Sequence, residues 1–220
     1  MNADLTVVVP VFNGAKFLAP LLQQLRAGEV IVVDDGSTDE TPAIAREFEV
    51  TYLHQAQRGP AAARNAGLRR ASTEFVAFLD VDDEWNPPHP ADALALLQRS
   101  SWDVIVGQTR CLTNNSATLT EPFHTFNLGS ALFRRDVFAR VGDFDEALAF
   151  GEDLDWFLRA RERGVRMALI EATTLHYRLH EQNLIGRAGA AKNGMLHALH
   201  LSIARRRESH AALADLPRIA

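Results

Sequence analysis

The sequence predicts an α/β protein whose central sheet is mostly parallel and is covered by helices on both faces. In its first half, short apolar runs alternate with segments that have the apolar spacing of helices. The runs are apolar throughout, which is typical of strands buried on both faces of a parallel sheet. At 220 residues, with 47% apolar and 23% charged residues, the chain is long enough to bury a sizeable core.

Four short runs rich in branched and aromatic residues predict the strands of this sheet: residues 5–10, 30–34, 50–53 and the run that opens at Phe75. Three intervening segments predict helices: residues 15–27, a segment that ends near Phe48, and residues 60–70. The second helix follows Asp35-Gly-Ser-Thr-Asp39, where Ser37 or Thr38 is the expected N-cap. Because parallel strands end at the same edge of a sheet, we expect ligands to bind at their carboxyl ends.

The second half is less regular. Pro87-Pro-His-Pro90 is expected to form a rigid turn before another helix. Beyond it we expect a helix that opens at Glu152, a strand over residues 166–170 and a long helix over residues 192–214. Residues 108–127 follow no recognisable pattern.

The run Phe75-Val-Ala-Phe-Leu ends in Asp80-Val-Asp-Asp83, which is unusual for a buried strand unless a positive group lies there. Asp80 and Asp82 are two residues apart, so at a strand end they point the same way and can converge on one cation, with Asp83 beside them. Oxygen ligands favour hard ions, so the expected metal is Mg²⁺ or Mn²⁺, and Mg²⁺ usually binds substrate phosphates as well. The alternative is that Asp82 and Asp83 only cap the following turn.

Two further polar motifs follow strands and should reach the same edge of the sheet: Pro10-Val-Phe-Asn13 and Asp34-Asp-Gly-Ser37. Either Asp34 or Asp35 can accept hydrogen bonds from a nucleobase or from ribose hydroxyls, as acids do in other nucleotide-binding α/β folds. The alternative role of both acids is to cap the turn and the helix that follows. Three such motifs should line one crevice.

The segment Arg58-Gly-Pro-Ala-Ala-Ala-Arg64-Asn65 opens a helix with small residues, so an anionic ligand can approach the free N–H groups of its first turn. Arg64 lies about one turn inside, where it can reach phosphates or a base, and arginine suits phosphate well. Asn65 either does the same or supports the neighbouring loop. The alternative for Arg64 is a solvated position, as expected for Arg69 and Arg70.

Together these motifs resemble the family-2 glycosyltransferases of the GT-A fold. The resemblance rests on four segments in this order: Val-Pro-Val-Phe-Asn-Gly, Val-Val-Asp-Asp-Gly-Ser-Thr-Asp, Ala-Arg-Asn-Ala-Gly and Phe-Leu-Asp-Val-Asp-Asp. Gly129–Asp145 and Gly151–Asp155 are similar to the family's acceptor-side segments. The resemblance implies a Rossmann-like central sheet flanked by helices, an acceptor-side second half and a C-terminal helix.

It also implies a nucleotide-diphosphate sugar as donor and a divalent metal, Mn²⁺ or Mg²⁺. By matching position, the implied donor-binding residues are Pro10, Val11, Asn13, Asp35, Arg64, Asp80 and Asp82. Asp35 matches the acid that contacts the base, whereas Asp80 and Asp82 match the ribose and metal carboxylates. Whether Asp82 or Asp83 is the main metal ligand stays open. Within one domain, the expected parts are a donor half (1–107), an acceptor and catalytic half (108–190) and a helical tail (191–220).

Sugar transfer to a hydroxyl requires a base, and a carboxylate that opens a helix facing the crevice would supply it. Glu152 and Asp153 follow Gly151 and precede an amphipathic segment. Two acids in the first turn of a helix also compensate its dipole, so the position alone does not decide. The resemblance implies that Asp153 is the general base, whereas Asp143 and Asp145 are expected to be structural.

The segment His176-Tyr-Arg-Leu-His180 resembles a segment of related enzymes that lies close to the donor diphosphate. His180 is therefore a candidate metal or phosphate ligand, with Arg178 as added positive charge; histidine favours Mn²⁺. The alternative is that both histidines are ordinary hydrogen-bonded surface residues. Residues 183–190, which contain two glycines, are expected to form a lid.

Composition excludes several classes of protein. A net charge of −5 and a pI near 5.9 argue against nucleic-acid binding. No apolar run reaches the roughly 18 to 20 residues of a membrane span, and no signal peptide is visible, so a cytoplasmic location is expected. The single cysteine, Cys111, is expected to be inert. Arg205-Arg-Arg207 in the tail leaves open a peripheral contact with anionic lipids, a homodimer contact or a solvated face.

The expected function is an inverting glycosyltransferase of glycan, polysaccharide or glycolipid biosynthesis that moves a single sugar from a UDP- or dTDP-sugar to an acceptor hydroxyl. The Gln-x-x-Arg-Trp motif of the family's processive synthases is absent from the sequence. Two alternatives are a nucleotidyltransferase that makes nucleotide sugars and a non-catalytic nucleotide-sugar-binding protein. The first lacks a Gly-rich loop with basic residues after the first strand, and the second would not need Glu152-Asp153.

Overall fold

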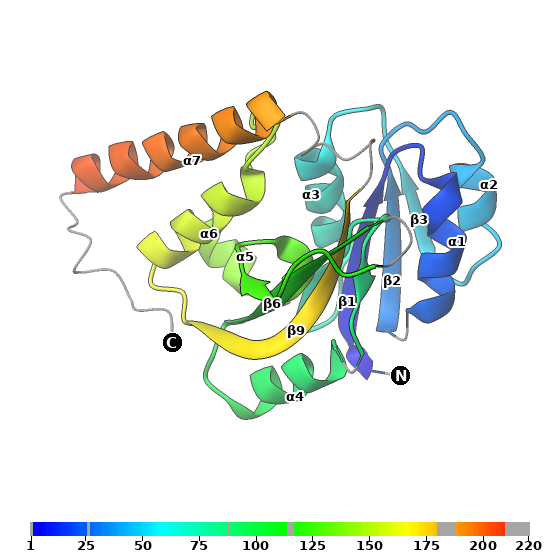
Figure 1. Cartoon of the computed structure of the whole chain (residues 1–220), viewed down its shortest axis with the longest axis horizontal. Helices are drawn as coiled ribbons and strands as arrows, with labels where there is room; N and C mark the ends of the chain where they lie inside the picture. The colour runs from blue at the N-terminus through cyan, green and yellow to red at the C-terminus, as the bar shows by residue number, and fades with distance from the viewer. Residues whose placement is uncertain (1, 26, 88, 114–116, 180–187, 210–220) are drawn as a thin grey trace.

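The computed structural model describes residues 2–25, 27–87, 89–113, 117–179 and 188–209 (Figure 1). Its elements in chain order are β1 (Asn2–Val11), α1 (Ala15–Gln24), β2 (Ala27–Asp34), α2 (Thr41–Ala45), β3 (Thr51–His54), α3 (Pro60–Arg70), β4 (Phe75–Phe78), β5 (Glu84–Trp85), α4 (Ala91–Arg99), β6 (Val104–Thr113), β7 (Phe123–His124), a 3₁₀ turn (Leu128–Ser130), β8 (Ala131–Arg134), α5 (Val137–Val141), α6 (Glu152–Glu162), β9 (Met167–Leu179) and α7 (Ala188–Ser209).

One sheet runs through the molecule in the order β3-β2-β1-β4-β8-β6-β9-β5, with β7 paired to β6. The strands β3, β2, β1 and β4 are mutually parallel, as predicted for the first half. β8 is antiparallel to both of its neighbours, β4 and β6, whereas β6 and β9 are parallel. The second half of the sheet is therefore mixed, which the sequence did not predict.

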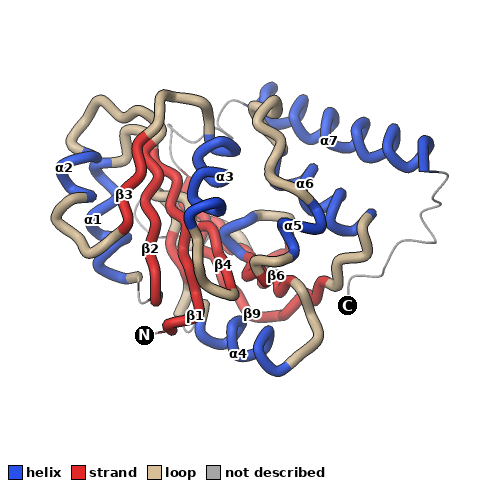
Figure 2. Tube along the Cα trace, turned by 180° about the vertical axis from the view of Figure 1, so that it is seen from behind, coloured by secondary structure: helices blue, strands red, loops and turns tan. Residues whose placement is uncertain are grey.

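Helices cover both faces of the sheet (Figure 2). Successive residues of a strand point to opposite faces, so β1 contributes to two cores. Val8 packs with residues of α3, α5 and α6 in one cluster, whereas its neighbours Val7 and Val9 pack with residues of α1 and α4 in the other. All three are fully buried. This confirms the prediction of apolar strands covered on both sides.

Two predicted helices are shorter in the structure. The first ends at Gln24, because Leu25 is already extended, and Ala27 begins β2. The second is only Thr41–Ala45, and neither Ser37 nor Thr38 is its N-cap. Both residues are engaged with Asn13 instead, as described below. The prediction failed because their side chains and backbone groups serve the neighbouring loop rather than the helix.

The second half extends the prediction in several places. β9 continues to Leu179, well past the predicted end at residue 170. It pairs along the whole of β6 on one side and with β5 on the other. Residue 107, the expected border between the two halves, lies inside β6. α7 begins at Ala188, so it includes the last residues of the expected lid; residues 183–187 of that lid lie outside the described ranges. Within the described ranges, no helix is both long and apolar enough to cross a membrane.

Gly67 sets how closely α3 approaches the sheet. A Cβ atom at this position would lie 2.3 Å from Cγ1 of Val8 and 3.2 Å from Cγ2 of Val33. Both valines are fully buried in the core and cannot move aside. The substitution Gly67→Ala should therefore lower the free energy of unfolding by about 1–3 kcal/mol, despite the better helix propensity of alanine. Urea denaturation measures this, with the exposed Arg70→Ala on the same helix as control. An unchanged midpoint for Gly67→Ala would contradict the packing.

Candidate active site

A chain of hydrogen bonds joins the predicted polar motifs at the carboxyl ends of β1 and β2. Asn13 donates its backbone N–H to Oγ of Ser37 at 2.8 Å and accepts from the backbone N–H of Thr38 at 2.8 Å through Oδ1. Asn13 has a φ of 50°, a conformation that asparagine tolerates well. Pro10 and Val11 are both buried, and the carbonyl of Val11 accepts from the backbone N–H of Asp35 at 2.8 Å. The first two motifs thus form one loop pair.

The two acids of the second motif have different surroundings. Asp34 is fully buried and accepts from the backbone N–H of Ser37 at 2.8 Å and from the hydroxyl of Tyr52 at 2.6 Å. This is the turn-capping role. Asp35 accepts from the backbone N–H groups of Arg58 and Gly59 at 2.9 and 2.8 Å. It therefore ties the second motif to the start of α3.

Arg64 is the centre of the site. It is buried on α3, with a side chain only 7% exposed. Its Nη1 donates to Glu152 at 2.5 Å and its Nη2 donates to Asp80 at 2.7 Å. Burial alone would lower the pKa of the Arg64 guanidinium, but these carboxylates, with that of Asp153, outweigh it and raise the pKa above its usual range. Arg64 is thus neither solvated nor free to bind phosphate with both Nη groups, and instead it joins the donor motif to the start of α6.

Glu152 and Asp153 open α6, as predicted. Glu152 is buried and ion-paired with Arg64, whereas Asp153 is half-buried and accepts from the backbone N–H of Leu154 at 2.7 Å. Sequence reasoning treated Glu152 only as a neighbour of the base. The sequence around Glu152 does not indicate that it forms an ion pair, because its partner Arg64 lies 88 residues away along the chain.

The surroundings of Asp153 favour its protonated form. Enough protein surrounds the carboxyl group that desolvation is the largest cause, and the charge of Glu152 adds to it, which together raise the pKa of Asp153 to about 7. The hydrogen bond from Leu154 and the charge of Arg64 lower the pKa of Asp153, whereas the charge of Asp80 raises it further. A carboxyl group whose pKa lies near neutral pH is well matched to proton transfer.

Asp82 and Asp83 lie in a turn after β4 rather than on the strand itself. β4 ends at Phe78, and the backbone N–H of Asp83 donates to the carbonyl of Asp80 at 3.1 Å. The prediction that Asp80 and Asp82 point the same way assumed that both lie at the end of the strand, and this assumption was wrong. Asp80 binds Arg64, whereas the side of the turn that carries Asp82 and Asp83 faces α1.

A cavity of about 230 Å³ lies on that side, between α1 and the turn. Its lining includes Asp82, Asp83, Lys16 and Arg178. This volume is below the roughly 300–1,000 Å³ of sites for drug-sized ligands, so it suits one small group rather than a whole nucleotide sugar. Lys16 is a residue that the sequence reasoning missed, since it was taken only as part of a helix.

The acids of this turn fit a divalent cation in their chemistry. Asp83 is buried, and burial together with the charges of Asp82 and Asp80 raises its pKa well above the usual range. The backbone N–H of Arg178 donates to Asp83 at 3.0 Å and opposes this only in part. A hard cation would relieve the excess negative charge. Within the described ranges, however, no three acidic, histidine or cysteine side chains form a group that could hold a metal, so phosphate oxygens would have to complete its shell.

Asn65 holds the loop before α6. Its amide donates to the carbonyl of Phe144 at 2.9 Å and to Glu146 at 3.0 Å, and its Oδ1 accepts from the backbone N–H of Phe144 at 2.9 Å. The structure therefore gives Asn65 the loop-supporting role. Asp143 accepts from Arg69 at 3.3 Å, and Asp145 accepts from a backbone N–H of its own turn at 2.9 Å, in line with structural roles.

Arg178 and His176 lie on β9 beside β5. Nη2 of Arg178 donates to Glu84 at 2.9 Å, and Nδ1 of His176 lies 3.4 Å from the same carboxylate. Arg178 therefore brings positive charge to the turn of Asp83, whereas the partner of the His176 ring is Glu84. His180, the predicted third metal ligand, lies outside the described residues.

Comparison with known proteins decides the family. The model described as Glycosyl transferase family 2 matches residues 6–124, which is more than half of the chain. The chain belongs to glycosyltransferase family 2. Its relatives include the pre-mycofactocin glycosyltransferase of Mycobacterium tuberculosis, at 34% identity over 76% of this chain and 41% of the relative. Another is the glycosyltransferase AglE of Haloferax volcanii, at 28% identity over 72% of this chain and 62% of the relative.

Solved structures show the same GT-A fold. Staphylococcus aureus TarS 1–349 in complex with UDP-GlcNAc matches 92% of this chain and 65% of its own, with a TM-score of 0.74 and 22% identity. The mannosyltransferase PcManGT of Pyrobaculum calidifontis, in complex with GDP-Man and Mn²⁺, matches 91% of this chain and 64% of its own, with a TM-score of 0.72 and 22% identity. The family-2 chain thus spans less than two thirds of each of these proteins.

Proposed function

We propose that this chain is an inverting glycosyltransferase that moves a single sugar from a nucleotide-diphosphate sugar to an acceptor hydroxyl, in the synthesis of a glycan, polysaccharide or glycolipid. The observation that carries the proposal is Arg64, which joins Asp80 of the donor motif to Glu152 beside Asp153. A donor motif is therefore joined through Arg64 to the neighbour of a candidate base whose pKa is near neutral pH. Family membership and the complexes of TarS with UDP-GlcNAc and of PcManGT with GDP-Man support a nucleotide-sugar donor.

In this proposal Asp153 accepts the proton of the acceptor hydroxyl as its oxygen attacks the anomeric carbon. The bond from that carbon to the diphosphate breaks on the opposite face, so the anomeric configuration inverts and the nucleoside diphosphate leaves with the bonding electrons. Asp35 and the turn of Asn13 bind the base end of the donor, and Asp80 binds the ribose. Arg64 holds Asp80 and the first turn of α6 at a fixed separation, which orients the base.

Asp82 and Asp83 would hold the divalent metal, Mn²⁺ or Mg²⁺. When bound, such an ion stabilises the negative charge that develops on the leaving diphosphate. Lys16 and Arg178 line the same cavity and add positive charge there. The mixed charge of this lining suits a phosphate group that reaches the metal.

The donor site is tested by calorimetric titration of the chain with UDP, dTDP, GDP and CDP, each with and without Mn²⁺. We expect Mn²⁺-dependent binding that discriminates between bases, with UDP or dTDP favoured. Asp82→Asn should remove the dependence on Mn²⁺. Asp92→Asn, an exposed acid at the start of α4, should behave as the unaltered chain does.

Binding of no diphosphate under any condition would contradict the donor site. Equal Mn²⁺ dependence in Asp82→Asn would contradict the metal assignment alone. Release of pyrophosphate from a nucleoside triphosphate and a sugar phosphate would instead identify a nucleotidyltransferase. Tight donor binding with no turnover on a broad acceptor panel would identify a binding protein.

A further inference from the structure

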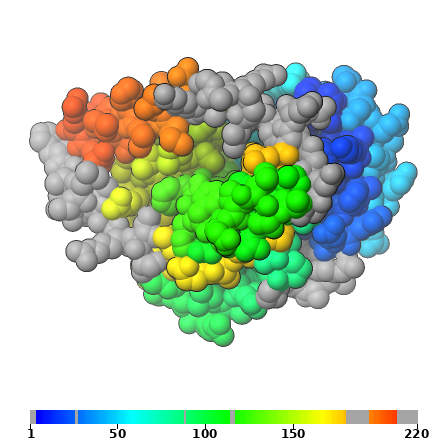
Figure 3. Space-filling model, viewed as in Figure 1, coloured from blue at the N-terminus to red at the C-terminus, as the bar shows by residue number. Residues whose placement is uncertain are grey.

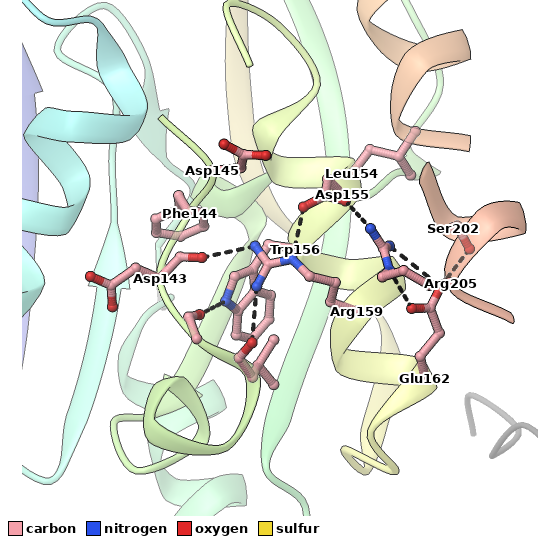
Figure 4. Close-up of polar contacts among 12 residues, drawn as sticks. Asp143, Phe144, Asp145, Leu154, Asp155, Trp156, Arg159, Glu162, Ser202 and Arg205 are labelled. Atoms are coloured by element: carbon pink, nitrogen blue, oxygen red, sulfur yellow. Dashed lines mark hydrogen bonds and ion pairs between the residues drawn. The ribbon is translucent and has the colours of Figure 1, made fainter. Parts of the chain in front are cut away.

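The orientation of α7 is fixed by contacts with α6 (Figure 4). Arg205 donates to Glu162 at 2.7 Å and to Asp155 at 2.9 Å, and the hydroxyl of Ser202 donates to Glu162 at 2.5 Å. Asp155 is buried and is also paired with Arg159 at 2.8 Å. Arg205 therefore points toward α6, which matches none of the three alternatives left open for residues 205–207.

The face of α7 that packs on the protein is made of small residues. Ala198 and Ser202 are buried, and Gly194 lies so close to the loop before α6 that an added Cβ would be 2.6 Å from the carbonyl oxygen of Phe150. Small residues every three or four positions let two backbones approach closely. With Arg205, they fix which side of the helix faces outward.

The outward face is apolar. The structure describes nine exposed large apolar side chains, and four of them lie on α7: Met195, Leu196, Leu199 and Ile203, which are 56%, 47%, 40% and 38% exposed. Their spacing of three and four residues places them on one stripe. In the space-filling view, α7 forms an outer edge of the molecule (Figure 3). The usual polarity of a surface helix is thus reversed, with small residues inside and large apolar residues outside.

Charge indicates what covers this stripe. Residues 188–209 contain four basic residues against one acid, a net charge of +3, whereas the whole chain carries −5 and the rest of it therefore −8. Arg206 and Arg207 follow Ile203 by three and four residues, so they border the stripe, and Arg207 is exposed. The one acid, Glu208, lies off the stripe. An apolar stripe bordered by arginines is complementary to an anionic lipid surface.

The same charge argues against a second copy of this chain. Two α7 helices packed stripe to stripe would bring arginines together without an acid on the stripe to pair with them. Four side chains of one helix are also far fewer than the about 20–30 residues per partner of a stable protein interface. An acidic membrane surface satisfies both the apolar and the cationic groups.

We propose that the stripe Met195, Leu196, Leu199 and Ile203, with the exposed Arg207, docks the protein on an anionic membrane surface. The docking helix lies against the loop that precedes the candidate base: Gly194 packs on Phe150 and Gly151, directly before Glu152 and Asp153 at the start of α6. Docking therefore holds that loop at the membrane, where it can meet a lipid-linked acceptor.

The test is co-sedimentation of the 220-residue chain with vesicles, either of phosphatidylcholine alone or of phosphatidylcholine and phosphatidylglycerol in equal parts. We expect binding to the mixed vesicles that is about tenfold or more stronger than to phosphatidylcholine and that weakens at high ionic strength. The double variant Leu199→Ser, Ile203→Ser should weaken binding to the mixed vesicles about tenfold or more. Arg207→Glu should remove most of the preference for anionic lipid.

The matched control is the double variant Leu119→Ser, Phe123→Ser, which removes two exposed apolar side chains outside α7, 51% and 41% exposed. It should bind like the unaltered chain. Circular dichroism checks that each variant is folded, which is expected because all of these side chains are exposed. Leu196→Trp or Leu199→Trp gives a second readout: a blue shift in emission on addition of mixed vesicles, beyond any change in the unaltered chain with its three tryptophans.

Absence of binding to mixed vesicles would overturn the proposal, as would equal loss of binding in the Leu119, Phe123 control. Concentration-dependent dimers in sedimentation equilibrium that Leu199→Ser, Ile203→Ser makes monomeric would assign the stripe to a second copy instead. None of these measurements depends on sugar transfer, so the proposal can fail or stand separately from the proposed function.

Discussion

Asp153→Asn should reduce kcat/KM for sugar transfer by about 10²–10⁴-fold while donor binding is retained, because general base catalysis typically contributes that much. The amide cannot accept the acceptor proton, yet it has almost the shape of the carboxylate. Asp153 opens α6 and is not among the proposed donor or metal ligands, so calorimetric affinity for the nucleoside diphosphate should change little. Transfer assays and calorimetry on the same preparation separate the two effects.

The same substitution should raise stability at alkaline pH. Asp153 ionises near 3.8 in the unfolded chain but near 7 in the folded protein. The folded state therefore binds the proton more tightly, and stability falls as pH rises from about 4 to about 7. One pKa unit corresponds to about 1.4 kcal/mol, so removal of this ionisation should stabilise the protein by about 2–4 kcal/mol above pH 7 and by almost nothing near pH 4.

The pH profile of transfer provides the matching kinetic measurement. With a base whose pKa is about 7, kcat/KM should rise with pH and level off above that value. Asp143→Asn is the control, because this acid lies in the loop before α6, has a side chain 50% exposed and pairs with Arg69. Full activity of Asp153→Asn, or a profile that is flat between pH 5 and pH 9, would remove Asp153 as the base.

Local patterns predicted the first half of the fold well. The bounds of α3 were predicted correctly, and the four parallel strands follow from apolar runs, because burial on both faces leaves a signal in each run by itself. The antiparallel β8 and the mixed second half leave no such signal. The lengths of the strands in the second half depend on the strands beside them. β9, for example, extends to Leu179 because it pairs with β6 and β5.

The candidate site shows the same division. Asp80, Arg64 and Asp153 were each singled out from their own segments. What the sequence did not contain is the arrangement: Arg64 was expected to bind donor phosphates, but it pairs with Asp80 and with Glu152, which is 88 residues away. The pattern on α7 was misread for a related reason, because Arg205 looks exposed in sequence until its partners on α6 are known.

Arg64→Gln should lower the free energy of unfolding by about 3–5 kcal/mol, because it leaves the buried carboxylate of Glu152 without its cation. The side chains of Arg64 and Glu152 are only 7% and 10% exposed, so water cannot replace the lost partner. Arg69→Gln on the same helix is the control: its side chain is 56% exposed, and its loss should change stability by about 0.5 kcal/mol or less. Equal denaturation midpoints for the two variants would contradict the role of Arg64 as the central ion pair.

The two partners should also shift the pH profile in opposite directions. Arg64 lowers the pKa of Asp153 and Glu152 raises it, so Arg64→Gln should move the rise in kcat/KM to higher pH and Glu152→Gln should move it to lower pH. A general loss of structure would not shift the pH profiles of the two variants in opposite directions. Removal of a positive charge in one variant and a negative charge in the other, both beside the same base, should do so. Shifts in the same direction would mean that the network supports the fold without setting the base. Opposite shifts would establish that Arg64 both holds α6 against the donor motif and tunes the group that accepts the proton.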